Sequence, residues 1–134
     1  MITTRILSLD DAKTIAAAAR AEAVKNNWTV VIAIVDEGGH LMYLERADGT
    51  QKASSVIAVE KAKTAILFKR PSLALEEGVT KGRMVMMSLP GAVTVEGGVP
   101  IVVDGQYVGA VGVSGVQSSQ DGIVARAGVA AFTG

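Results

Sequence analysis

GGVPIVVDGQYVGAVGVSGVQSSQD (residues 97–121) predicts two strands joined by a tight turn at Asp104-Gly105, where glycine tolerates the positive φ that such turns require. Glycine within a strand weakens it and marks close approach by another backbone or by a ligand. Alternation puts Gly109 and Gly112 on opposite faces of the second strand. A helix packed on the sheet is therefore the simpler explanation, and a ligand surface is the alternative. The predicted faces are Tyr107, Gly109, Val111 and Val113 on one side, with Val108, Ala110, Gly112 and Ser114 on the other.

The end of this stretch predicts a helix over residues 119–132. The first N–H groups of such a helix favour a bound anion near Ser114. Ser118 and Asp121 have capping-box spacing, however, and they satisfy the same donors within the chain. Self-capping is thus favoured over a ligand site. The glycine spacing is no dinucleotide fingerprint, because these glycines lie inside a hairpin strand rather than opening a βαβ unit.

The segments before this stretch alternate helices with pairs of strands. Ser8 and Asp11 form a capping box before an alanine-rich helix over residues 8–25, and Gly38-Gly39 separates two strand-like runs. A second helix ends near Lys69, because Pro71 disfavours helical geometry at the residue before it. A short helix, a loop and a strand over residues 92–95 follow. Three methionines of this region are expected to fill an irregular gap: Met84, Met86 and Met87.

This order predicts an α+β fold: a three-layer α/β/α sandwich with a central, mostly antiparallel, five-stranded sheet. The 134 residues fit a single domain, 1–134. Lys plus Arg and Asp plus Glu both number 13, so no net field attracts nucleic acid or an anionic membrane. The N-terminus has no signal-peptide pattern, which predicts a cytoplasmic protein. A mean hydropathy of +0.38 is high for a small monomer and predicts a homo-oligomer.

The chain has few residues suited to metal or nucleophilic chemistry. There are no cysteines, and His40 is the only histidine, which leaves a single axial ligand as the remaining metal role. His40 and Arg46 lie on one face of a strand together with Met42 and Leu44, about 20 Å apart at ~3.3 Å per residue, so they do not grip one small ligand together. Capping or solvation of His40, and pairing of Arg46 with Asp48, are the simpler interpretations.

Lys61 lies mid-helix among alanines. It is expected to reach solvent or to pair with a neighbouring acid, and a desolvated lysine is also a nucleophile or base. No serine accompanies a histidine and a carboxylate at recognisable spacing, so hydrolase-type catalysis is disfavoured. The five candidate binding residues are His40, Arg46, Lys61, Ser114 and Asp121, with His40 as the metal ligand.

Three stretches together resemble the GlcG/HbpS-like family: VVIAIVDEGGHLMYLERADG, AVEKAKTAILFKRPS and GGVPIVVDGQYVGAVGVSGVQSSQDGIVARAG. The likeness spans about residues 8–132 and has the family's motifs in order. It implies a central antiparallel sheet between helices, and multimers that reach octamers. Haem or a related tetrapyrrole is the ligand that the resemblance implies, with His40 as its candidate axial ligand.

The leading hypothesis is an oligomeric accessory protein that binds haem or a related tetrapyrrole without catalysis of its own. The apolar contact area would come from Val111, Val113 and the methionine segment. The alternative is an enzyme for a small hydroxy or oxo carboxylate of glycolate-type metabolism, with Arg46 or Lys61 holding the carboxylate and Asp121 or Asp48 as acid or base. A third interpretation makes the glycine-rich sheet an assembly surface that binds no ligand.

Overall fold

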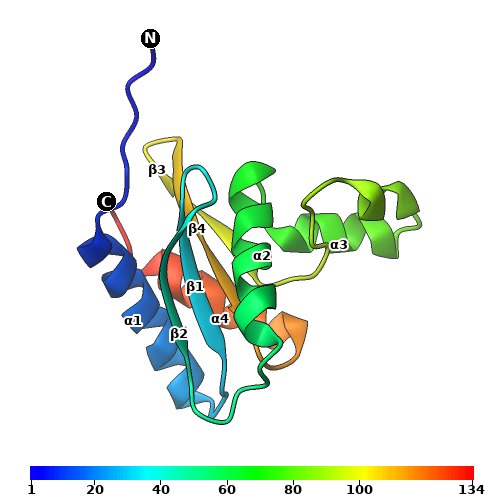
Figure 1. The fold of residues 1–134 in the computed structure, drawn as a ribbon, viewed down its shortest axis with the longest axis horizontal. Coiled ribbons are helices and arrows are strands. Elements are labelled where there is room, and N and C mark those ends of the chain that lie inside the picture. The colour runs from blue at the N-terminus through cyan, green and yellow to red at the C-terminus, as the bar shows by residue number, and fades with distance from the viewer.

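The computed structural model describes all 134 residues and has four α-helices around one sheet (Figure 1). In chain order the elements are α1 (Leu9–Lys25), β1 (Val31–Asp36), β2 (Leu41–Arg46), α2 (Ser54–Leu67), α3 (Ser72–Thr80), the 3₁₀ helix η1 (Met84–Ser88), β3 (Gly98–Val103), β4 (Gln106–Ser114) and α4 (Ser118–Ala130). The α+β class is therefore confirmed.

The sheet has four strands in the order β2-β1-β4-β3, and every neighbouring pair is antiparallel. The prediction of five strands was wrong, because residues 92–95 form no strand. The N–H of Val93 donates instead to Thr64 Oγ1 on α2 at 2.9 Å, so this segment is bound to a helix side chain and not to a neighbouring strand. In β1, Val31 to Val35 are all buried, so this strand is covered on both faces.

Helices cover both faces of the sheet. Helix α2 packs on one face, where Ala62, Ala65 and Ile66 meet Val35 and Ala110. Helices α1 and α4 lie side by side on the other face and share the larger core with the sheet. That core contains Ile15, Ala19, Ile32, Ile34, Val111, Val113, Val124 and Ala125. The predicted arrangement of a sheet between helix layers is thus present.

Helix α2 lies on two glycines that face each other across β3 and β4. Gly98 and Gly112 are register partners. A Cβ at Gly112 would overlap the Ala58 carbonyl oxygen and come within 2.7 Å of the Ala62 nitrogen, and a Cβ at Gly98 would overlap the Lys61 carbonyl oxygen. The simpler interpretation of the glycine-rich strands was therefore correct: helix backbone, not ligand, occupies the space. The same contact leaves this part of the sheet covered within the chain, rather than open for assembly.

A bulge changes the predicted faces of β4. Ile101 pairs with Gly109 but Val102 pairs with Tyr107, so Val108 is the extra residue. As a result Val108 joins the core beneath α1 and α4, while Tyr107 packs on the α2 side, the reverse of the prediction. A second bulge between Ile34 and Val35 moves Met42 of β2 away from the α2 side, where Leu44 remains.

The helix starts were predicted with mixed success. The capping box of Ser8 and Asp11 is present before α1. The predicted Ser118–Asp121 box was wrong: Gln117 precedes α4, and its N–H donates to the Gln120 side chain at 3.3 Å. Asp121 is buried and has other partners, described below. Helix α2 ends at Leu67, two residues before the predicted Lys69.

Helix α3 and η1 form an arm (residues 72–88) that projects from the body beside α2 (Figure 1). Only Ser72 and Leu75 of the arm are buried. The three methionines do not fill a gap in the core as predicted, because η1 contains no buried residue.

We predict that Gly112→Ala lowers the free energy of unfolding by about 3 kcal/mol, since helix backbone would have to shift to admit a methyl group. The measurement is urea denaturation followed by circular dichroism. Gly78→Ala is the matched control: its Cβ would lie an ordinary 3.4 Å from the Met86 side chain, and alanine favours the helix by up to ~1 kcal/mol. Equal effects of the two substitutions would contradict the assigned contact.

Candidate functional site

Two of the predicted residues, Lys61 and Asp121, form a buried ion pair. Lys61 extends from the middle of α2, and Asp121 lies in the first turn of α4. The Lys61 Nζ lies 3.1 Å from Asp121 Oδ2 and also donates to the Val113 carbonyl oxygen at 3.1 Å. Their side chains are only 2% and 3% exposed, respectively. The pair therefore links two helices that lie on opposite faces of the sheet.

Glycine makes room for this lysine. At Gly97, which has a φ of +135°, a Cβ would lie 2.9 Å from both Cδ and Nζ of Lys61. Any larger residue would meet the buried ammonium group and its stem. The sequence signal for this contact is the Gly97-Gly98 pair at the start of β3, because Gly97 admits the lysine side chain and Gly98 admits the helix backbone.

Asp121 has a second role at the turn between β4 and α4. Its Oδ1 accepts the Val116 N–H at 3.1 Å, and the Gly115 N–H also donates to this carboxylate. Burial raises the pKa of Asp121 above its ordinary value, against the opposing effects of the Lys61 charge and these two donors. With its oxygens occupied in this way, the carboxylate leaves no open position for an anionic ligand.

Ser114 lies next to the pair but faces a different partner. Its Oγ is 2.9 Å from Ser54 Oγ at the start of α2, and Gln51 Nε2 donates to the same Ser54 oxygen at 2.9 Å. Ser54 and Ser114 are both buried. This chain of hydrogen bonds fixes the loop before α2 to the end of β4, which is a structural role.

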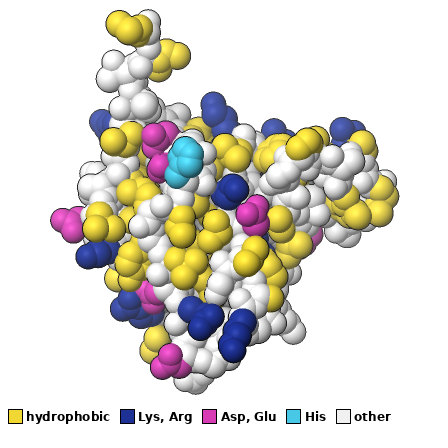
Figure 2. Space-filling model, in the orientation of Figure 1, with side chains coloured by type: hydrophobic (Ala, Val, Ile, Leu, Met, Phe, Trp, Pro, Cys, Tyr) yellow, Lys and Arg dark blue, Asp and Glu magenta, His cyan; other side chains and the backbone are white.

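His40 and Arg46 occupy opposite ends of the β2 hairpin region, as predicted. His40 is 82% exposed and stands on the surface beside acidic side chains (Figure 2). Arg46 is exposed, and its Nη1 lies 3.5 Å from Ser55 Oγ. Its predicted pairing with Asp48 is absent, since no ion pair joins them. The five candidates are therefore divided among separate places rather than gathered in one pocket.

Asp36, which was not among the predicted site residues, contacts both the backbone and the ring of His40. Asp36 Oδ1 accepts the backbone N–H groups of Gly38 and His40, each at 2.9 Å, and lies 3.3 Å from His40 Nδ1. The ring can approach because a Cβ on Gly38 would lie 2.9 Å from it. The signal was present in the sequence, because an aspartate before a Gly-Gly turn commonly bonds to backbone two residues on.

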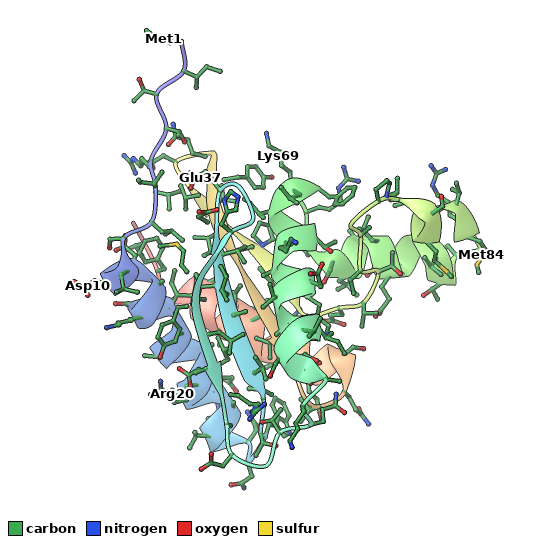
Figure 3. All side chains as sticks on the ribbon, in the orientation of Figure 1. Met1, Asp10, Arg20, Glu37, Lys69 and Met84 are labelled. Atoms are coloured by element: carbon green, nitrogen blue, oxygen red, sulfur yellow. The ribbon has the colours of Figure 1, made fainter.

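Apolar and basic side chains lie near His40 at this end of the molecule. We define the hairpin-tip surface as His40, Leu41, Leu67 and Lys69. Leu41 and Leu67 are each about half exposed, and Gly39 of the turn packs within reach of Leu67. Lys69 is exposed, and its Nζ lies 5.4 Å from the centre of the Tyr107 ring. Figure 3 places Lys69 at the same end of the molecule as Glu37 in the hairpin turn.

One small cleft of about 80 Å³ lies elsewhere, between the N-terminal segment and the C-terminal end of the chain. None of the five candidate residues lines it; its lining is Arg5, Ile6, Leu7, Asp11, Val103, Val108, Phe132 and Gly134. No three acidic or histidine side chains gather in a way that could hold a metal ion. No helix is long and apolar enough to cross a membrane.

Breaking the buried ion pair should be costly. We predict that Lys61→Met lowers the free energy of unfolding by about 3 kcal/mol or more, because it leaves the Asp121 charge buried and unpaired. Adding Asp121→Asn should restore part of the loss, since the remaining amide oxygen can still accept the Val116 N–H. A double-mutant cycle by urea denaturation measures the coupling.

The exposed pair of Arg5 and Asp104, 2.9 Å apart, provides the control for this cycle. Its coupling should lie below about 1 kcal/mol, because solvent screens it. If the effects of the Lys61 and Asp121 substitutions on the free energy of unfolding are additive, the two side chains are not coupled and the assigned ion pair does not stabilise the fold.

The stability contributed by Asp36 should depend on pH. Although burial opposes it, donation by the His40 and Gly38 N–H groups lowers the pKa of Asp36 below its ordinary 3.8. This contribution is therefore present above pH 3.8 and is lost as the pH falls through the lowered value. We predict that wild type loses stability relative to Asp36→Asn as the pH falls from 5 toward 2, measured by urea denaturation. A difference that is constant over this range would contradict the assignment.

Comparison with known proteins places the chain in a family. Residues 7–130 match the family described as "Haem degrading protein HbpS-like". Protein GlcG of Escherichia coli K12 is 49% identical over 114 residues, which cover 85% of each chain.

Two solved structures also resemble it. The crystal structure of a double mutant of Streptomyces reticuli HbpS has a TM-score of 0.91 at 30% identity, over 100% of this chain and 92% of that one. The crystal structure of a PduOC:heme complex has a TM-score of 0.86 at 30% identity, over 96% of each chain. The resemblance in motifs thus extends to the whole sequence and fold, and the chain belongs to the HbpS-like family.

Proposed function

We propose that this protein binds haem or a related tetrapyrrole at the hairpin-tip surface, with His40 as the axial ligand to the iron. The observation that carries the proposal is the contact between His40 and Asp36. A histidine that ligates a metal usually donates its other ring N–H to a carboxylate, which fixes the tautomer and raises the basicity of the free nitrogen. Donation from Nδ1 to Asp36 Oδ1 would leave Nε2 as the free, exposed acceptor.

The surroundings of His40 suit the rest of such a ligand. A tetrapyrrole has a wide apolar face and carries carboxylate groups at its edge. Leu41 and Leu67 offer exposed apolar area beside His40, and Lys69 offers an exposed cation at the same end of the molecule. Bound iron would supply redox and gas-ligand chemistry, while the chain would contribute one nitrogen ligand, contact area and charge.

The comparisons support the ligand class. A family relative at 30% identity was crystallised as a heme complex, and the family description names haem. An accessory role in glycolate metabolism, assembly into a homo-oligomer and a cytoplasmic location complete the proposal. The apolar walls expected from Val111 and Val113 are not part of it, because both residues are buried in the core.

The carboxylate-enzyme alternative has less structural support. Lys61 and Asp121 are buried against each other, so a substrate would have to separate them before either could act. Arg46 and Asp48 are exposed, but the cleft between the termini does not include them.

A haem titration of the purified full chain, followed in the Soret region, tests the proposal. We expect saturation at one haem per chain. His40→Ala should remove the Soret shift or weaken binding at least ~10-fold, and Asp36→Asn should weaken binding by about 10-fold because it loses the orienting carboxylate.

Arg46→Ala is the matched control, because it changes an exposed residue at the far end of β2 and should leave binding unchanged. Titration without a saturable shift on folded wild-type protein would overturn the haem proposal. Unchanged binding and spectra for His40→Ala would overturn the axial role.

A further inference from the structure

Lys69 has a backbone conformation that lysine rarely adopts. Three residues other than glycine have a positive φ in this chain: Asn27, Lys69 and Asp104, with values of 57°, 55° and 49°. Asparagine and aspartate tolerate the left-handed region, because their short polar side chains bond to nearby backbone. Lysine has no such compensation, so its backbone is strained here and the choice of lysine has another reason.

The end of helix α2 requires a positive φ at position 69, but it does not require a lysine. The N–H of Lys69 donates to the Ile66 carbonyl oxygen at 3.3 Å. The N–H of Arg70 donates to the Ala65 carbonyl oxygen at 3.1 Å. These two bonds end the helix in a motif that usually has glycine at this place. Glycine would therefore end α2 with less strain.

The charge of Lys69 is not neutralised within the chain. None of the seven ion pairs includes it. The cation that favours the carbonyl end of a helix is Arg70, whose Nε donates to the Phe68 carbonyl oxygen at 2.9 Å. Lys69 Nζ instead lies 5.4 Å from the centre of the Tyr107 ring. An aromatic ring attracts a cation without neutralising it, so the ammonium group stays free to bind an anion.

Lys69 lies beside the apolar part of the hairpin-tip surface. Gly39 precedes His40 in the turn, and a Cβ at Gly39 would lie 3.5 Å from the Leu67 side chain. Leu67 is 53% exposed and comes two positions before Lys69. Figure 3 shows Lys69 at the same end of the molecule as the turn. This end of the molecule therefore combines a nitrogen ligand, an exposed apolar side chain and an unpaired cation.

We propose that Lys69 makes the hairpin-tip surface selective for tetrapyrroles with a free carboxylate at the edge of the ring, over those whose edge carboxyls are esterified or amidated. This inference rests on the proposed haem site and specifies which chemical form of the ligand that site prefers. With iron on His40, the ring would lie over Leu67 and its edge carboxylate would bind the Lys69 ammonium group. A hydrogen bond between two charged groups is stronger than one to a neutral ester, so the ester loses most of this contact.

The first test compares haem with haem dimethyl ester, each titrated into the full chain and followed in the Soret region at one low detergent concentration. We expect wild type to bind haem ~10-fold more tightly than the diester. Lys69→Gln should weaken haem binding to the level of the diester and leave diester binding unchanged. Lys52→Gln is the matched control, because it removes the same charge from an exposed lysine before the opposite end of α2 and should keep the selectivity.

The outcomes separate the two proposals. Equal affinities of wild type for haem and its diester, or an unchanged ratio in Lys69→Gln, would overturn the selectivity while leaving the haem site in place. A titration without a saturable shift for either ligand would overturn the haem site itself, and the selectivity with it.

The second test uses Lys69→Gly to separate binding from stability. Glycine adopts the positive φ without strain, so this variant should unfold at a urea concentration no lower than that of wild type. It should still lose haem affinity as Lys69→Gln does, because the ammonium group is absent. A clear fall in the urea midpoint would show that the lysine serves the fold, and would overturn the argument that the strained backbone is retained for binding.

Discussion

The close seating of helix α2 on the Gly98–Gly112 pair is the constraint on which the rest of the structure depends. Because neither residue has a side chain, the helix backbone lies against the strands instead of resting on a layer of methyl groups. At this depth Lys61 enters the interior beside Gly97 and meets Asp121 from the other layer. A substitution at one of these glycines and a substitution at Asp121 would therefore both disturb the packing of α2 on the sheet.

The interior and the exposed hairpin each pair a basic side chain with an aspartate, for different purposes. Lys61 and Asp121 are enclosed, so their hydrogen-bonding capacity is directed to each other and to nearby backbone. His40 contacts a neighbouring carboxylate through Nδ1, and most of its side chain remains exposed. Burial removes reactivity from the first pair, and exposure preserves it in the second.

Much of the fold followed from local sequence signals. The capping box at Ser8, the turn at Gly38-Gly39 and the turn at Asp104-Gly105 all depend on residues close in the chain, and each is present; Asp104 and Gly105 have φ values of 49° and 77°. Two of the errors had different origins. The missing fifth strand is explained by Thr64, a partner 29 positions away in the sequence, and the exchanged faces of Tyr107 and Val108 by a bulge opposite Val102 within the same hairpin. Lys61 and Asp121 were each predicted from the sequence as separate site candidates, but only the packing of α2 and α4 shows that they are partners.

The buried ion pair has a consequence for how the chain is made. Its partners are 60 positions apart in the sequence, with Lys61 on α2 and Asp121 on α4. During synthesis from the N-terminus, α2 emerges long before the acid that neutralises its lysine. If α2 packed on the sheet as in the native structure before then, the Lys61 charge would be buried in an apolar interior without its partner. Helix α2 therefore packs fully on the sheet only once α4 is available to supply Asp121. The two helix layers and the sheet thus complete the fold as one unit.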